Sequence, residues 1–134
     1  MAEFLTDEWI EQALVIYESV TEVAEEIKSI STILGLRVHD IPPDGISEDF
    51  FIIVDEGIVI DLGRGKPPFD PDAVIEGDYE TARGMILGEL DSASSLATGK
   101  VKVSGDMGKL VKFAAQQQHP TSVEVTARVR EMTD

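Results

Sequence analysis

The sequence contains no cysteine. Disulfide frameworks, zinc sites built on thiolates and cysteine nucleophiles are therefore excluded. Long apolar runs are also missing, since a stretch such as Phe50 to Val54 is far shorter than the roughly 20 residues that cross a bilayer. The amino end lacks the basic start and apolar run of a signal peptide, and the carboxyl end lacks a retention tripeptide. We therefore expect a cytoplasmic protein without stable membrane insertion.

Basic residues are scarce, because 11 Lys and Arg face 26 Asp and Glu, which gives a formal net charge of −15. Such a charge repels nucleic acid phosphates and anionic lipid headgroups, so nucleic acid is excluded as a partner. The 134 residues are 43% hydrophobic, which suits one domain over residues 1–134 with one buried core.

Helix and strand periodicities alternate along the first half of the chain. Thr6 can cap a helix in which apolar residues recur every three or four positions as far as Ile27, with a break near Ser19. Leu34 to Val38 alternates like a half-buried strand. Residues 50–62 then predict a hairpin, with a three-residue turn at positions 55–57 that ends in glycine.

The second half contains short strands followed by capped helices. Asp78 can cap a helix after the strand at residues 73–75, and a shorter helix is expected at residues 91–97. Val101 and Val103 alternate with lysines as in an edge strand, and Asp106 can cap the next helix. The tail fits either a strand or a helix; we favour a helix capped at Thr121, with an apolar stripe of Val125, Val129 and Met132.

Residue patterns typical of catalysis or metal binding do not occur. His39 and His119 have no acidic or histidine partner at ligand spacing. Asp70 and Asp72 are not followed by further oxygen ligands at calcium-loop spacing. In "SGDMGK", Asp106 occupies the place where a bound phosphate would rest. We therefore expect no catalytic residues, no metal and no cofactor.

One segment resembles a known family. "VIEGDYETARGMILGELDSASSLATGKVKVSGDMGKLVKF" is similar to the second half of a sterol carrier protein domain of the type-two class, the nonspecific lipid-transfer family. The resemblance rests on Gly77-Asp78 at the start of a helix and on the passage from Thr98 to Met107, followed by Leu110 to Phe113. The hairpin at residues 50–62 resembles the central strands of that family.

The resemblance implies an α+β fold with a mostly antiparallel five-stranded sheet covered by helices. An apolar tunnel between sheet and helices would accept a sterol, a fatty acid, a fatty acyl derivative or another lipid. Gly99, Gly105, Asp106 and Met107 would form the corner between a strand and a helix. The residues expected to line the tunnel are Phe51, Ile53, Ile58, Ile60, Met85, Ile86, Leu90, Leu96, Met107, Leu110, Phe113, Val129 and Met132.

Two functional hypotheses follow from the resemblance. The first is a noncatalytic module that binds a hydrophobic small molecule and can transfer it, with Arg64 or Arg83 as the partner of a ligand carboxylate. The second is an accessory domain of the same fold that uses an exposed apolar rim to bind a partner enzyme or a second copy of itself. An enzyme ranks third. The sequence shows no general base paired with a nucleophile and no set of metal ligands, and catalysis would require one of these.

Overall fold

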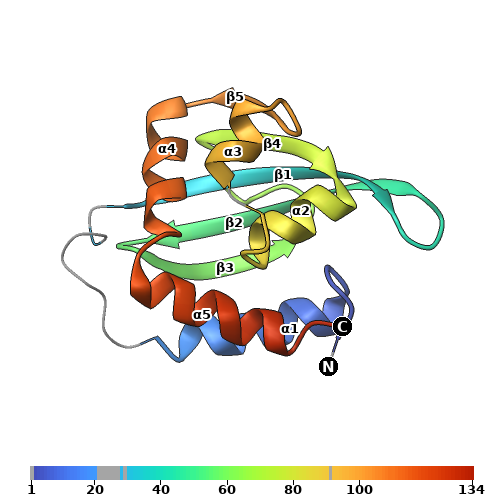
Figure 1. Ribbon diagram of the computed structural model, residues 1–134, viewed down its shortest axis with the longest axis horizontal. Coiled ribbons are helices and arrows are strands. Elements are labelled where there is room, and N and C mark those ends of the chain that lie inside the picture. Colours follow the sequence, from blue (N-terminus) through green and yellow to red (C-terminus); the bar gives the residue numbers. More distant parts are fainter. Residues whose placement is uncertain (1, 21–27, 29, 91) are drawn as a thin grey trace.

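Five strands form one sheet in the computed structural model, which describes residues 2–20, 28, 30–90 and 92–134 (Figure 1). Their order is β3-β2-β1-β4-β5. Only β1 and β4 pair in parallel, so the expected α+β fold with a mostly antiparallel five-stranded sheet is confirmed. The strands are β1 (Thr32–Ile41), β2 (Ile46–Asp55), β3 (Ile58–Arg64), β4 (Ala73–Asp78) and β5 (Lys102–Gly105).

The helices pack on the sheet face that carries its buried aliphatic side chains. Leu36 and Val38 of β1 and Phe50, Ile52 and Val54 of β2 belong to the core on this face, together with side chains from α1 and α5. Figure 1 shows α2 and α4 against the strands, α3 next to α2 and α4, and α5 beside α1 at the β3 edge. The helices are α1 (Asp7–Glu18), α2 (Tyr79–Ile86), α3 (Ser92–Ala97), α4 (Met107–Gln116) and α5 (Pro120–Glu131).

The hairpin between β2 and β3 turns more tightly than expected. Asp55 pairs with Ile58, so the loop has the two residues Glu56 and Gly57 rather than three. Both have positive φ, 48° and 81°, as a type I′ turn requires. The Glu56 amide donates to the Ser31 hydroxyl at 3.0 Å, which holds the non-glycine residue in this conformation.

The helix caps agree with the sequence at three of the four predicted positions. Thr6, Asp78 and Asp106 each accept a backbone N–H at the start of α1, α2 and α4. The predicted tail helix is α5, but its cap is the His119 ring rather than Thr121. The expected continuation of the first helix to Ile27 falls on residues 21–27, which lie outside the described part; α1 itself ends at Glu18.

The two ends of the chain are joined beside α1. Ala2 and Thr133 form an isolated parallel bridge, and the amide of Asp134 donates to the Ala2 carbonyl at 2.8 Å. The indole N–H of Trp9 donates to the Thr133 hydroxyl at 2.8 Å, in surroundings that leave neither side chain appreciably exposed. These contacts hold the end of α5 against α1.

Candidate ligand-binding cavity

Two adjoining cavities lie between the sheet and the helices. The first, called here the hairpin cavity, has a volume of about 80 Å³ and is lined by residues of β2, β3, α1, α2, α4 and α5. The second, the central cavity, has a volume of about 50 Å³ and lies between β1, β4, α2 and α4. Its walls are almost wholly apolar, with Leu34, Ile75, Met85, Val101 and Leu110 among them.

Four side chains line both cavities and therefore stand between them: Ile52, Ile86, Phe113 and Gln117. At about 80 and 50 Å³, each space alone is small. A long hydrocarbon chain enters only if the intervening side chains move aside and the spaces become one. Phe113 and Ile86 come from different helices, α4 and α2.

The hairpin cavity combines apolar walls with uncharged polar groups. Trp9, Ile58, Leu62 and Val125 supply apolar surface, and Tyr17 contributes a phenol. Burial raises the pKa of Tyr17 to about 12, so this phenol is protonated at neutral pH and can donate a hydrogen bond. No charged side chain occurs among the described residues that line this cavity.

Gln116 is a residue of this cavity that the sequence analysis did not single out. It is only 6% exposed, and its amide nitrogen donates to the Gly57 carbonyl at 2.7 Å. Its amide oxygen has no hydrogen-bond partner in the part of the chain that the structure describes. The available signal was its position three residues after Phe113, which places both on one side of α4.

Five of the residues expected to line a tunnel meet at the two cavities. Ile58 and Ile86 contact the hairpin cavity. Met85, Leu110 and Phe113 contact the central cavity, which Ile86 also touches. These side chains come from β3, α2 and α4, so the structure brings together residues from three separate parts of the chain.

Four other expected residues point elsewhere. The buried positions of β2 are Phe50, Ile52 and Val54, so Phe51 and Ile53 project from the opposite face of the sheet. The Phe51 ring lies over Gly63 there, so close that an added Cβ would come within 2.5 Å of it. Both strand faces of this hairpin are apolar, so the sequence alone does not show which face meets the helices. Ile60 and Met107 are about half exposed, which removes them from the walls.

Three of the remaining expected residues pack away from the two cavities, and the side chain of the fourth is not described. Val129 is fully buried in the main core, and Met132 packs against that core. Leu90 fills the space above Gly84 and lines a separate surface pocket with Arg130. The side chain of Leu96 lies outside the described part of the structure.

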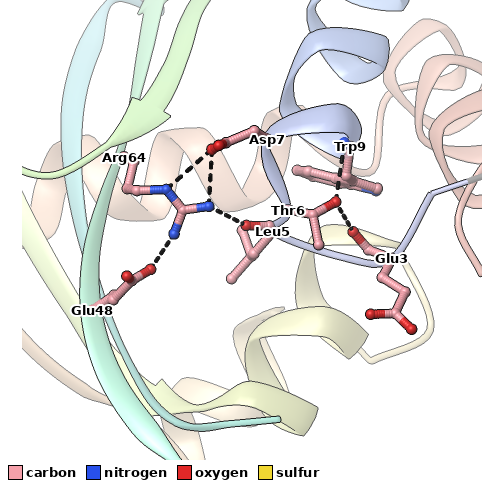
Figure 2. A network of polar contacts seen from close by, with 7 residues as sticks. All are labelled: Glu3, Leu5, Thr6, Asp7, Trp9, Glu48 and Arg64. Atoms are coloured by element: carbon pink, nitrogen blue, oxygen red, sulfur yellow. Dashed lines mark hydrogen bonds and ion pairs between the residues drawn. The ribbon is translucent and has the colours of Figure 1, made fainter. Parts of the chain in front are cut away.

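The two arginines proposed as carboxylate partners are engaged away from both cavities. Figure 2 shows the Arg64 guanidinium between Asp7, Glu48 and the Leu5 carbonyl, to which it donates at 3.0 Å. Its charge also lies 5.3 Å from the centre of the Phe50 ring. Arg83 pairs with Glu89 and donates to the main chain of Asp134. Neither arginine belongs to the cavity walls.

His39 has an acidic partner that its sequence neighbours do not supply. Parallel pairing of β1 with β4 places its Nε2 atom 2.5 Å from a Glu76 carboxylate oxygen, and its Nδ1 atom lies 2.7 Å from the Ser47 hydroxyl. The hydrogen bond from His39 lowers the pKa of Glu76. Sequence spacing could not reveal this contact, because the partners lie 37 positions apart. The cluster is solvent-exposed and outside both cavities, so we assign it no catalytic role.

Acidic residues elsewhere form no metal site among the described residues. Asp72 instead accepts the Ile33 amide at 2.8 Å and the Lys109 ammonium at 3.1 Å. The Ile33 bond and then the Lys109 bond lower the pKa of Asp72. Asp72 thus ties the loop before β4 to β1 and α4.

Comparison with known proteins places these features in a family. A crystal structure of sterol carrier protein 2 matches with a TM-score of 0.65 and 19% identity, over 96% of this chain and 98% of that one. The solution structure of the sterol carrier protein domain 2 of Helicoverpa armigera matches with a TM-score of 0.60 and 20% identity. The match covers 95% of this chain and 89% of that one. The structure of palmitated SCP2L2 from Aedes aegypti matches with a TM-score of 0.60 and 19% identity. The match covers 86% of this chain and 96% of that one. These likenesses show the fold.

A sequence comparison gives the family itself. No curated protein matches the chain at a significant level. Within the described part, no helix combines the length and the apolar character needed to cross a membrane. The model of the SCP-2 sterol transfer family matches residues 12–118. Because that match spans most of the sequence, the chain belongs to the SCP-2 sterol transfer family.

Proposed function

We propose that the chain acts as one lipid-binding domain that holds a sterol, a fatty acid or a fatty acyl derivative between its sheet and its helices and can transfer it. The observation that carries this proposal is the pair of apolar cavities that meet at Phe113 and Ile86. Family membership supports it, and so does the palmitate of the Aedes aegypti relative. We infer binding rather than catalysis, because the described residues of the cavity walls include no nucleophile paired with a base.

The hydrophobic effect is large enough to drive such binding. Burial of apolar surface contributes about 25 cal/mol per Å², so a hydrocarbon chain that buries a few hundred Å² gains several kcal/mol. Part of this gain is lost to the cost of association and of moving the walls apart. The balance is compatible with micromolar affinity, about −8 kcal/mol.

A charge placed between the cavities tests the proposal. Phe113→Asp puts a carboxylate where the ligand chain must pass, and an unpaired buried charge is costly enough to weaken binding at least about tenfold. Met107→Asp is the matched control, since Met107 lies on the same helix but is half exposed. Delipidated wild type and variants are titrated with a fluorescent fatty acid, and circular dichroism establishes that each is folded.

The result decides the proposal in either direction. Saturable binding by wild type and by Met107→Asp, with at least tenfold weaker binding by Phe113→Asp, supports it. Equal affinities of the three folded proteins would contradict the placement of the ligand. If Phe113→Asp does not fold, Ile86→Asp supplies the same charge from α2.

A second candidate function is favoured by exposed apolar side chains on α4 and α5. Met107, Val111 and Val123 are each about half exposed or more. Met107 and Val111 lie four residues apart and so share one side of α4, as an apolar rim for a partner protein would require. Absence of saturable lipid binding at micromolar concentrations would favour this role.

A further inference from the structure

Basic residues gather in one acid-poor stretch of this acidic chain. Residues 92–123 contain only one of the 26 acidic residues, Asp106. They also contain four of the 11 basic residues, which are Lys100, Lys102, Lys109 and Lys112. This stretch therefore carries a net charge of +3 and the rest of the chain −18, which together give the total of −15. The total hides a division of the charge between two regions.

The acid-poor stretch forms one edge of the sheet and the helix beside it. Strand β5 is the last in the sheet order, and α4 follows it directly. Figure 1 shows α4 on the side of the molecule away from the two chain ends. All four lysines are exposed. Among the ion pairs of the described residues, one engages them, between Lys109 and Asp72 at 3.1 Å. The Asp106 carboxylate accepts the Lys109 amide at the start of α4.

Exposed apolar side chains lie among these charges on α4. Met107 is 49% and Val111 is 59% exposed, and their spacing of four residues places them on one side of the helix. Lys112 follows Val111 directly and is also exposed. Phe113 lines both cavities, so the inner side of α4 belongs to the core. The outer side, called here the α4 flank, consists of Met107, Lys109, Val111 and Lys112.

An anionic lipid surface complements the α4 flank better than a protein does. Helices that carry lysines beside apolar side chains lie in the interface of anionic membranes, where each lysine is attracted to the headgroups. Two exposed apolar side chains are few for the core of a stable protein interface. At an ionic strength of about 0.1 M, charges more than about 10 Å away are largely screened. A domain of this size is roughly 35 Å across, so acidic groups on its far side oppose docking only weakly.

We propose that the α4 flank docks the protein on the surface of an anionic membrane, with Lys109 and Lys112 near lipid phosphates and with Met107 and Val111 between the headgroups. The contact is peripheral, because no helix of the described residues could cross a bilayer. Since the inner side of the same helix forms part of the cavity walls, docking brings both cavities close to the bilayer. This inference goes beyond the proposed function, and docking can be measured without a ligand in the cavities.

Sedimentation with lipid vesicles tests the inference. Delipidated wild type is mixed with vesicles of phosphatidylcholine alone, or of phosphatidylcholine with an equal amount of phosphatidylglycerol. We expect partition onto the anionic vesicles only, and loss of it at about 1 M salt, where the screening length falls to about 3 Å. Lys112→Glu should weaken the partition at least about tenfold, because it reverses a charge at the surface and each such charge contributes about fivefold. Val111→Asp should weaken it as well.

A matched control separates the α4 flank from the total charge. Lys66→Glu changes the net charge by the same amount in the loop after β3, and it should partition like wild type. Equal weakening by Lys66→Glu and Lys112→Glu would overturn the inference, and so would equal partition onto neutral and anionic vesicles. Circular dichroism establishes that each variant is folded.

Two further measurements interpret a negative result. If wild type does not partition onto anionic vesicles, the inference is wrong, and capture by immobilised polyglutamate would then assign the α4 flank to an acidic protein partner. Titration with a fluorescent fatty acid keeps the proposed function separate, since Lys112 lies outside the walls of both cavities. Lys112→Glu should bind the fatty acid as tightly as wild type. Failure of wild type to bind it would refute the proposed function and leave the docking result standing.

Discussion

The contact between Trp9 and Thr133 should make a large contribution to stability. The Thr133 hydroxyl accepts from the Trp9 indole at 2.8 Å and donates to the Val129 carbonyl at 2.7 Å. Thr133→Val keeps the shape but replaces this hydroxyl with a methyl group. The indole N–H is then left unpaired in a site where Trp9 is 0% exposed. Leaving a buried donor unsatisfied costs about 1–3 kcal/mol.

Urea denaturation measures this loss. For a chain of this size the free energy of unfolding falls by about 1–3 kcal/mol per molar urea, so a loss of about 2 kcal/mol lowers the midpoint by roughly 1 M. Thr133→Ser is the matched control, because it keeps both hydrogen bonds and removes only a methyl group. It should lose clearly less stability than Thr133→Val.

The same change should affect ligand retention. Helix α5 contributes Thr121, Ser122, Val125 and Thr126 to the hairpin cavity, and Thr133 holds its end to α1. Suppose that the stability lost in Thr133→Val makes it easier for α5 to detach locally from α1. The fraction of molecules with α5 detached, and with it the rate of lipid release, then rises by about tenfold for each 1.4 kcal/mol lost. Stopped-flow displacement measures that rate. An unchanged urea midpoint in Thr133→Val, or equal losses in Thr133→Ser, would refute the reasoning.

Two further predictions concern the loop and corner around β4. The lowered pKa of Asp72 means that its contribution to stability is complete above pH about 4 and is lost as the pH falls through the folded-state value. Asp72→Asn should therefore be less stable than wild type by about 1–2 kcal/mol at pH 7, with the difference vanishing toward pH 2; a difference that does not depend on pH would argue against this. Gly105 has φ 102°, and an added Cβ would lie 2.4 Å from the Asp72 carbonyl oxygen. Gly105→Ala should cost more than about 3 kcal/mol in thermal unfolding, against about 1 kcal/mol for Gly45→Ala, where φ is also positive but the space is open; similar melting temperatures would contradict the steric argument.

Local sequence signals predicted most of the secondary structure because short-range physics decides it. Thr6, Asp78 and Asp106 precede apolar runs with helical spacing, and each caps a helix in the structure. The alternation of Leu34 to Val38 is part of β1. The hairpin turn was located correctly and its length was not, since the contact of Glu56 with Ser31 depends on a residue 25 positions away.

The candidate site was predicted less completely than the fold. Leu110 and Phe113 were found because one apolar stripe of α4 can face only the sheet. Phe51 and Ile53 were assigned to the walls because β2 is apolar on both faces, and only packing against the helices distinguishes them from Phe50 and Ile52. Gln116 gave little signal, since a glutamine in a helix is usually exposed.

The sequence by itself determined the acidic surface, the absence of thiol chemistry, the capped helices, the strands and the likeness to a lipid-carrier family. Each of these depends on composition or on neighbours within a few positions along the chain. The tertiary structure decided which strand face meets the helices, that His39 lies against Glu76, and that the buried Gln116 side chain ties α4 to the turn between β2 and β3. These are contacts between distant segments, and they form only when the sheet order and the helix positions are fixed together.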